Sequence, residues 1–206
     1  ALLAACGGGG GSAGTTTGGS GGGSTPGGSA TLSVTDFALT IDKSSIVNGG
    51  TDTAQVSVVA VDANRNAVSG AAVAVAVNQN AVFTPGGLVT DATGNYKGVV
   101  SIGSDKSDRI ITIAATVNGI TKQVTLRVSG SRVTLQLLPS TPAPGQAVTA
   151  TAIVTDSSGN PIAGATVIFT SDIAALQGQS GITSASGQVA KAFTAPSAVG
   201  AYTINA

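Results

Sequence analysis

The chain has 206 residues, of which 42% are apolar, 9% charged and 3% aromatic, and nine basic residues balance nine acidic ones. A nucleic-acid-binding protein needs a concentrated basic patch, and neither sign of charge forms a run here, so we expect no nucleic-acid partner. His and Glu are absent, which excludes Ser-His-Asp and Cys-His catalysis and removes common proton-transfer groups. We therefore expect a protein that is not an enzyme, without catalytic, cofactor-binding or metal-binding residues.

Residues 1–6 read Ala-Leu-Leu-Ala-Ala-Cys, an apolar stretch that runs into small residues, as a signal peptide does near its cleavage site. Leu3-Ala4-Ala5-Cys6 resembles the lipobox of bacterial lipoproteins, and Cys6 is the only cysteine. The resemblance implies cleavage before Cys6 and a diacylglyceryl group on its sulfur, which would anchor the protein to a membrane through its acyl chains. Gly7, rather than Asp, resembles the outer-membrane sorting preference of such lipoproteins. The alternative is a chance pattern that ends in a free thiol.

Residues 7–30 contain 13 glycines, and Ser and Thr fill most of the other positions. Such a segment cannot bury enough apolar surface to offset its backbone entropy, so we predict a disordered linker. A flexible coil of 24 residues has a root-mean-square span of about 27 Å. This length would lift a folded module above a layer of lipid headgroups.

Apolar and polar residues alternate with a period of two over residues 31–130, which is typical of half-buried β-strands. Asn118-Gly119 is the most specific local signal, because this pair forms two-residue hairpin turns between strands that we expect at 111–117 and 124–128. About seven short strands predict a two-sheet immunoglobulin-like sandwich over 31–130. The other predicted strands lie at 32–35, 39–42, 54–60, 72–77 and 99–102, with turns at 48–50, 62–66, 85–87 and 91–95.

Residues 132–206 repeat this pattern. Residues 54–62 match 148–156, and the offset between matching segments drifts only from 94 to 91 residues along the chain, so we predict two copies of one module. The second copy has no equivalent of the Asn118-Gly119 hairpin and its closing strand. Because this leaves an open sheet edge, we expect a domain that is truncated at its C-terminus, in a piece of a longer chain. The alternative is a partner that donates the missing strand by β-augmentation.

The segment Val154–Phe169 reads Val-x-Asp-x-x-Gly-Asn-Pro-Ile-x-Gly-Ala-x-Val-x-Phe, and Thr183-x-x-x-Gly187 follows it. These motifs are similar to those of the bacterial Ig-like domains of invasin and intimin (Big-1). The resemblance implies all-β tandem immunoglobulin-like sandwiches behind the glycine-rich linker. It also implies extracellular stalks, often with adhesive terminal domains, and it brings no catalytic or cofactor residues. The first copy departs from the motif at Arg65 and Ala67.

A calcium site is the main chemical alternative. Asp62, Asn64 and Asn66 place oxygen atoms at alternate positions, as calcium loops do. The second copy reads Asp-Ser-Ser-Gly-Asn there, and no Glu exists to complete a site. Asx turns explain both loops without a metal, and we favour them. We predict that Asp105 and Asp108, which flank Lys106-Ser107, form a solvated hairpin tip.

These expectations lead to three hypotheses on function. The first is a lipid-anchored surface protein of the bacterial outer membrane, whose Ig-like repeats act as a stalk or spacer. The second is an invasin- or intimin-like adhesion module that binds a host or matrix protein or glycan through loops at one end of a sandwich. No exposed aromatic cluster or charged patch marks such a surface in the sequence. The third is an accessory part of a larger protein whose functional domain lies beyond residue 206.

Overall fold

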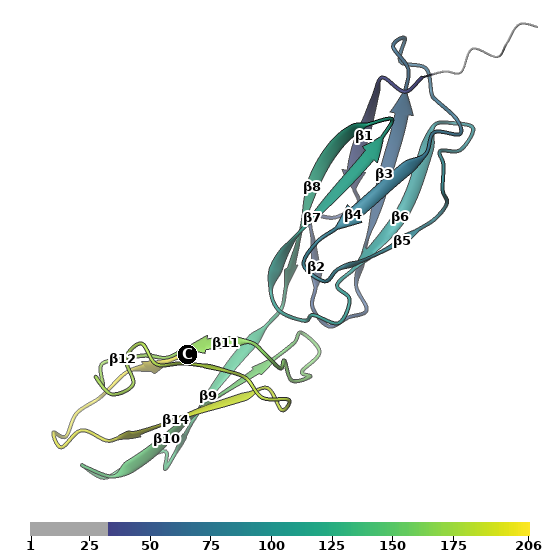
Figure 1. Cartoon of the computed structure of the whole chain (residues 1–206). Coiled ribbons are helices and arrows are strands. Elements are labelled where there is room, and N and C mark those ends of the chain that lie inside the picture. The colour runs from purple at the N-terminus through teal and green to yellow at the C-terminus, as the bar shows by residue number, and fades with distance from the viewer. Residues whose placement is uncertain (1–32) are drawn as a thin grey trace, which may run out of the picture. The chain divides into compact units, whose positions relative to one another are not determined.

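The computed structural model describes residues 33–206 (Figure 1), and these residues belong to one compact unit of the chain. Cys6 and the segment 7–30 lie outside the described residues. None of the elements in the described part of the chain is a helix that could span a membrane. The strands are β1 (Asp36–Ile41), β2 (Ser45–Val47), β3 (Thr53–Val61), β4 (Val73–Val77), β5 (Val82–Pro85), β6 (Asn95–Ser101), β7 (Arg109–Val117), β8 (Ile120–Ser129), β9 (Arg132–Leu138), β10 (Ala147–Thr155), β11 (Thr166–Ile168), β12 (Thr170–Ser171), β13 (Ser180–Ile182), β14 (Gln188–Thr194) and β15 (Ile204–Asn205).

Strands β1–β8 form the first module, a sandwich of two four-stranded sheets (Figure 1). One sheet has the order β1-β3-β6-β5 and the other β2-β8-β7-β4, and only β2 and β8 pair in parallel. Alternate residues of β3 and β7 point into the space between the sheets and are fully buried. The core is built almost wholly from Val, Ala, Ile and Leu, as a sequence with few aromatic residues requires.

The predicted hairpin is confirmed. Val117 pairs with Ile120, and Asn118 and Gly119 between them have φ angles of 49° and 77°. Both central residues are therefore left-handed, as the favoured two-residue hairpin turn requires. The predicted alternation is confirmed as well, because every second residue of 54–60 is buried and half-buried residues alternate with exposed ones over 72–77.

Part of the strand prediction was wrong. No strand covers 33–35, since pairing with β3 begins at Asp36↔Val61 and only the Thr35 amide reaches back, to the Val61 carbonyl at 3.0 Å. Strands β2 and β5 were not predicted. They have three and four residues, too few to establish a period.

Strands β9–β15 form the second module, with sheets β14-β10-β9, β11-β13 and β12-β15. Its secondary structure repeats that of the first module: β10 begins 94 residues after β3, and β14 begins 93 residues after β6. The pair Ser171↔Ile204 repeats Val77↔Ile113. The fold is therefore a tandem pair of β-sandwich modules, as the internal repeat predicted.

A buried threonine repeats in the two modules and explains the Thr-x-x-x-Gly motif. The Thr183 hydroxyl donates to the Ile162 carbonyl at 2.6 Å and accepts from the Ala165 amide at 2.9 Å. Thr90 makes the same two bonds in the first module, at 2.7 and 2.9 Å. The hydroxyl thus satisfies two backbone groups that no strand pairing reaches. Gly187 closes the motif with φ 72°, a left-handed conformation that favours glycine.

Candidate functional site: the junction between the modules

Two polar side chains are completely buried where the chain passes from β8 to β9. Asn48 begins the turn after β2, and Asp156 begins the turn after β10. Only Gly130 and Ser131 separate the end of β8 from the start of β9. A short connection brings the loops of the first module against the Asp156 turn of the second. The polar groups buried there need partners, and each finds them across the junction.

Asn48 binds both modules. Its Nδ2 donates to the carbonyl oxygen of Lys106 at 2.8 Å, to Ser131 Oγ at 3.0 Å and to Asp108 Oδ1 at 3.2 Å. Its Oδ1 accepts a bond from the backbone amide of Ser157 at 2.8 Å. One buried amide therefore connects β2, the loop before β7, the connection between the modules and the turn of the second module. Removal of this side chain would leave several buried groups without a partner.

Lys106 and Asp156 form an ion pair across the junction. The Lys106 Nζ lies 2.7 Å from Asp156 Oδ2, and the Asp156 side chain has no exposed surface while that of Lys106 is 31% exposed. Asp156 Oδ1 accepts the backbone amides of Ser158 and Asn160, each at 2.9 Å. The hydrogen bond from Lys106 is the main reason that the pKa of Asp156 lies far below its ordinary value. The carboxylate stays charged because its oxygens are fully paired.

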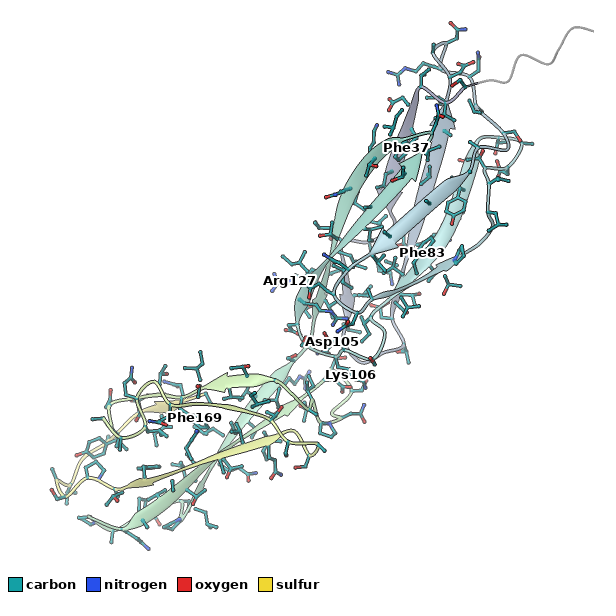
Figure 2. All side chains as sticks on the ribbon, in the orientation of Figure 1. Phe37, Phe83, Asp105, Lys106, Arg127 and Phe169 are labelled. Carbon is teal, nitrogen blue, oxygen red and sulfur yellow. The ribbon has the colours of Figure 1, made fainter. Side chains whose placement is uncertain are left out.

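Arg109 holds the loop that carries Lys106, and Figure 2 shows Asp105 and Lys106 in this loop. The Arg109 Nη1 donates to the carbonyls of Asp105 at 2.6 Å and Ser107 at 2.9 Å, and the Arg109 Nη2 donates to the carbonyl of Ile102 at 2.6 Å. The Arg109 side chain is only 8% exposed. A planar guanidinium with several donors can fix a loop in this way, whereas a lysine cannot. Arg109 thus fixes the backbone on both sides of Lys106 with contacts inside the first module.

Gly130 allows the close approach of the two modules. Its φ is 128°, and a Cβ at this position would lie 2.7 Å from Asn48 Oδ1 and 2.9 Å from Ser157 Cβ. A larger residue would push apart the two groups that the Asn48–Ser157 hydrogen bond joins. The glycine is therefore required by the junction and by its own backbone conformation.

The predicted Asx turn at Asp62 is confirmed. Asp62 Oδ1 accepts the amides of Asn64 and Asn66, both at 2.8 Å, and Oδ2 accepts from Asn66 Nδ2 at 3.1 Å. Hydrogen bonds from Asn66 are the main cause of the lowered pKa of Asp62. Within residues 33–206, the Cys, His, Asp and Glu side chains form no cluster of three or more that could hold a metal. Turn chemistry accounts for the Asp-Asn pattern in both modules.

The prediction of a solvated tip at 105–108 was wrong in part, because Asp108 is exposed but residues 105–107 are half-buried. Lys106 is paired with Asp156, and Asp108 Oδ1 accepts hydrogen bonds from the amide and the hydroxyl of Ser131 at 3.0 and 2.8 Å. The junction could not be seen in the sequence because the residues that meet across it, Lys106 with Asp156 and Asn48 with Ser157, lie 50 and 109 positions apart. Asn48 had been assigned only to a turn, and no local pattern connects it with Ser157. Cys6 lies outside the described residues, so its lipidation stays a prediction.

The network of a buried asparagine, a buried ion pair and a braced loop lies between two sandwiches with the same internal repeat. Residues 133–206 match the family profile of the bacterial Ig-like domain (group 1). The second module is therefore similar to bacterial Ig-like domains of group 1. This match confirms the predicted resemblance to Big-1 domains.

Comparison with solved structures supports the same fold for the described chain. The Yersinia pseudotuberculosis adhesin InvE is 21% identical, with a TM-score of 0.56 over 83% of this chain and 54% of the InvE chain. InvD of the same species is 23% identical, with a TM-score of 0.41 over 84% and 52%. Invasin, described as a bacterial integrin-binding protein, is 18% identical, with a TM-score of 0.45 over 82% and 35%. The chain thus spans about half of the InvE structure. The search of curated proteins gives no match.

Proposed function

We propose that the tandem modules act as a non-catalytic stalk of a surface lipoprotein, tethered to the bacterial outer membrane through a lipid on Cys6. In this proposal residues 1–6 are the end of the signal peptide with its lipobox cysteine, cleavage occurs before Cys6, and the linker covers 7–30. The first Ig-like domain covers 31–130, and residues 132–206 belong to a second Ig-like domain. The junction between the modules is the observation that carries the proposal.

A spacer has to keep its modules in one arrangement, and the junction has the properties that this requires. Opening it would expose the buried Asp156 carboxylate and the buried Asn48 amide and would return several hydrogen bonds to water. Each buried group that loses its partner costs about 1–3 kcal/mol. Among the described residues, no buried side-chain nitrogen or oxygen lacks a partner. A fully satisfied polar network favours one arrangement over others, since any slip leaves some of its groups unpaired.

The tether is tested by expressing the precursor with Cys6→Ser in a bacterial host and separating membrane from soluble fractions. The account predicts that the wild-type protein stays with the membrane and that the variant is released. Ser12→Ala, in the same segment, is the matched control and should behave as wild type. Retention of the Cys6→Ser protein on the membrane would remove lipid anchoring from the proposal.

Adhesion is the second candidate, because an adhesin shares the fold over most of the described chain. In this case the loops at one end of a sandwich would bind a host or matrix protein or glycan. Saturable binding of the purified chain to an array of immobilised matrix proteins and glycans would favour adhesion. Binding no higher than that of an unrelated β-sandwich protein would favour the stalk.

A further inference from the structure

The first module has an edge strand at each end of its two sheets, and charged side chains or proline protect the edges of β1, β2 and β5. In β1 the amide of Phe37 donates to Asp36 Oδ1 at 2.8 Å. In β2 the amide of Val47 donates to Asp52 Oδ2 at 3.1 Å. In β5, Pro85 has no amide to offer. Charges and proline at an edge discourage pairing with a strand of another chain.

Strand β4 is the edge of the first module that lacks this protection. It reads Val-Ala-Val-Ala-Val, and its five residues include no charge and no proline. It ends the sheet β2-β8-β7-β4, and β7 is the only strand of residues 33–206 that pairs with it. An uncharged edge rich in β-branched residues is a favourable template for another strand.

Two hydrogen bonds show which backbone groups of β4 point away from β7. The Val73 amide donates to the Leu88 carbonyl at 3.4 Å, on the side away from β7, whereas the Asn78 amide donates to β7 at 3.3 Å. In an antiparallel strand, successive residues direct their backbone groups to opposite sides. Val75 and Val77 therefore present both amide and carbonyl to the open side of β4.

This open part of the edge is self-complementary. Leu88 occupies the edge beside the first residue of β4, which leaves Val75 and Val77 for a partner strand. After β4, Gln79 has a φ of 54°, so the chain leaves the strand direction there. A second β4 that runs antiparallel and is centred on Ala76 fits between these limits. In this register Val75 of each copy exchanges amide-to-carbonyl hydrogen bonds with Val77 of the other.

The side chains of β4 suit this register. Ala76 is exposed and would face its own copy at the two-fold axis. Residues that face each other without exchanging hydrogen bonds have Cα atoms only about 4.5 Å apart, so a small side chain is favoured there. Val75 and Val77 pack against the core of their own module. Pairing of two copies therefore requires no change in the fold.

We propose that the first module pairs with a second copy of this chain through β4, in an antiparallel register centred on Ala76. The two sheets β2-β8-β7-β4 then form one continuous sheet across a two-fold axis. A second copy is the occupant because the sequence of β4 around Ala76 reads Val-Ala-Val in both directions. This inference does not depend on the stalk function. So short a ladder buries little surface, and we expect a reversible dimer with a dissociation constant in the micromolar to millimolar range.

The variants Ala76→Lys and Ala76→Glu test the register in the full chain, by sedimentation velocity with a reductant that keeps Cys6 from cross-linking. Each variant places two like charges at the two-fold axis and should weaken dimerisation at least about tenfold. An equimolar mixture of the two variants places opposite charges there and should restore the dimer. Thr40→Lys, at an exposed position on the edge strand β1, is the matched control and should dimerise as wild type.

A wild-type chain that stays monomeric up to about 1 mM would overturn the proposal. A mixture of the Lys and Glu variants that associates no better than either variant alone would overturn it as well. Because the Ala76 side chain is exposed, both variants should keep the fold of the wild type, which far-UV circular dichroism and thermal melting check.

Hydrogen exchange of single amides, followed by NMR at low and high protein concentration, locates the contact. The amides of Val75 and Val77 gain hydrogen bonds in the dimer and should exchange at least about tenfold more slowly at high concentration. The amide of Phe37, which Asp36 already accepts, should exchange at the same rate at both concentrations. A dimer with unchanged exchange at Val75 and Val77 would pair elsewhere and would contradict the proposal.

Discussion

The turns that begin at Asp62 and Asp156 have the same internal hydrogen bonds but different surroundings. In each turn Oδ1 accepts the amides two and four residues later, at 2.8–2.9 Å. Only Asp156 also meets a lysine from the other module, at 2.7 Å. The turn itself is a product of local sequence. The Asp156 turn contacts the first module only through residues such as Lys106 and Asn48. Single substitutions at the junction can test how much each contact contributes.

The largest effect is expected for Asn48→Ala. The change removes the hydrogen-bond partner of the Ser157 amide and of the Lys106 carbonyl, both of which are partly buried. The free energy of unfolding should fall by about 2–4 kcal/mol, as measured by urea denaturation. Asn95→Ala, at the start of β6, removes only an exposed side-chain hydrogen bond to Thr93 and should change the free energy of unfolding by less than about 0.5 kcal/mol. Equal effects of the two variants would show that the Asn48 network contributes no special stability.

Gly130→Ala tests the close approach of the modules. The new Cβ would meet Asn48 and Ser157 within 3 Å, and the φ of 128° strains any L-residue. The expected loss is about 2–3 kcal/mol in a thermal or urea melt. Gly145→Ala has a left-handed φ of 75° but open space around it, so backbone strain alone should cost about 1 kcal/mol. A loss for Gly130→Ala no greater than for Gly145→Ala would remove the crowding argument.

Lys106→Met should destabilise the chain less than Asn48→Ala and should change its pH dependence. The folded pKa of Asp156 lies below its unfolded value of about 3.9, so the stabilisation is present above that pH and is lost as the pH falls further. Without Lys106, the pKa of Asp156 should rise in a carboxyl NMR titration, while that of Asp62 should not move. The stability difference between wild type and variant should narrow below about pH 4. A constant difference from pH 7 to 2 would contradict the ion pair.

The smallest effect on stability is expected at Arg65, where the Asp62 turn has an arginine and the Asp156 turn has a glycine. Arg65 has a φ of 67°, a left-handed conformation that glycine adopts at the equivalent Gly159. Arg65→Gly should raise the free energy of unfolding by up to about 1 kcal/mol, because it relieves strain but adds freedom to the unfolded chain. Thermal melting would measure the change. A loss of stability would contradict this expectation and would show that the Arg65 side chain stabilises the fold by more than its backbone strain costs.

The repeat and the sandwich could be predicted because they rest on local patterns. Alternation over residues 54–60 identified a buried strand, and Asn118-Gly119 identified a hairpin, since both depend on near neighbours. Strand β2 was missed because its three residues owe their pairing to β8, about 80 residues later. Short strands at sheet edges carry too little pattern to be recognised alone.

The junction could not be predicted in the same way. Asp156 was recognised as a turn residue, but its partner Lys106 was assigned to a solvated tip. Most exposed lysines make no specific contact. Lys106 differs because Arg109 fixes its loop and because Asp156 of the second module lies within hydrogen-bond distance. Both are consequences of the folded chain. An asparagine followed by two glycines, as at Asn48, has the composition of an ordinary turn.

The central claim is that the junction holds the two modules in one arrangement. Residual dipolar couplings of backbone amides, measured in one weakly aligning medium for residues 36–129 and 132–205, test it directly. The account predicts that a single alignment tensor fits both modules in the wild-type chain and that Asn48→Ala separates them into two tensors. Two tensors of different magnitude in the wild-type chain would show that the modules move independently and would contradict the account.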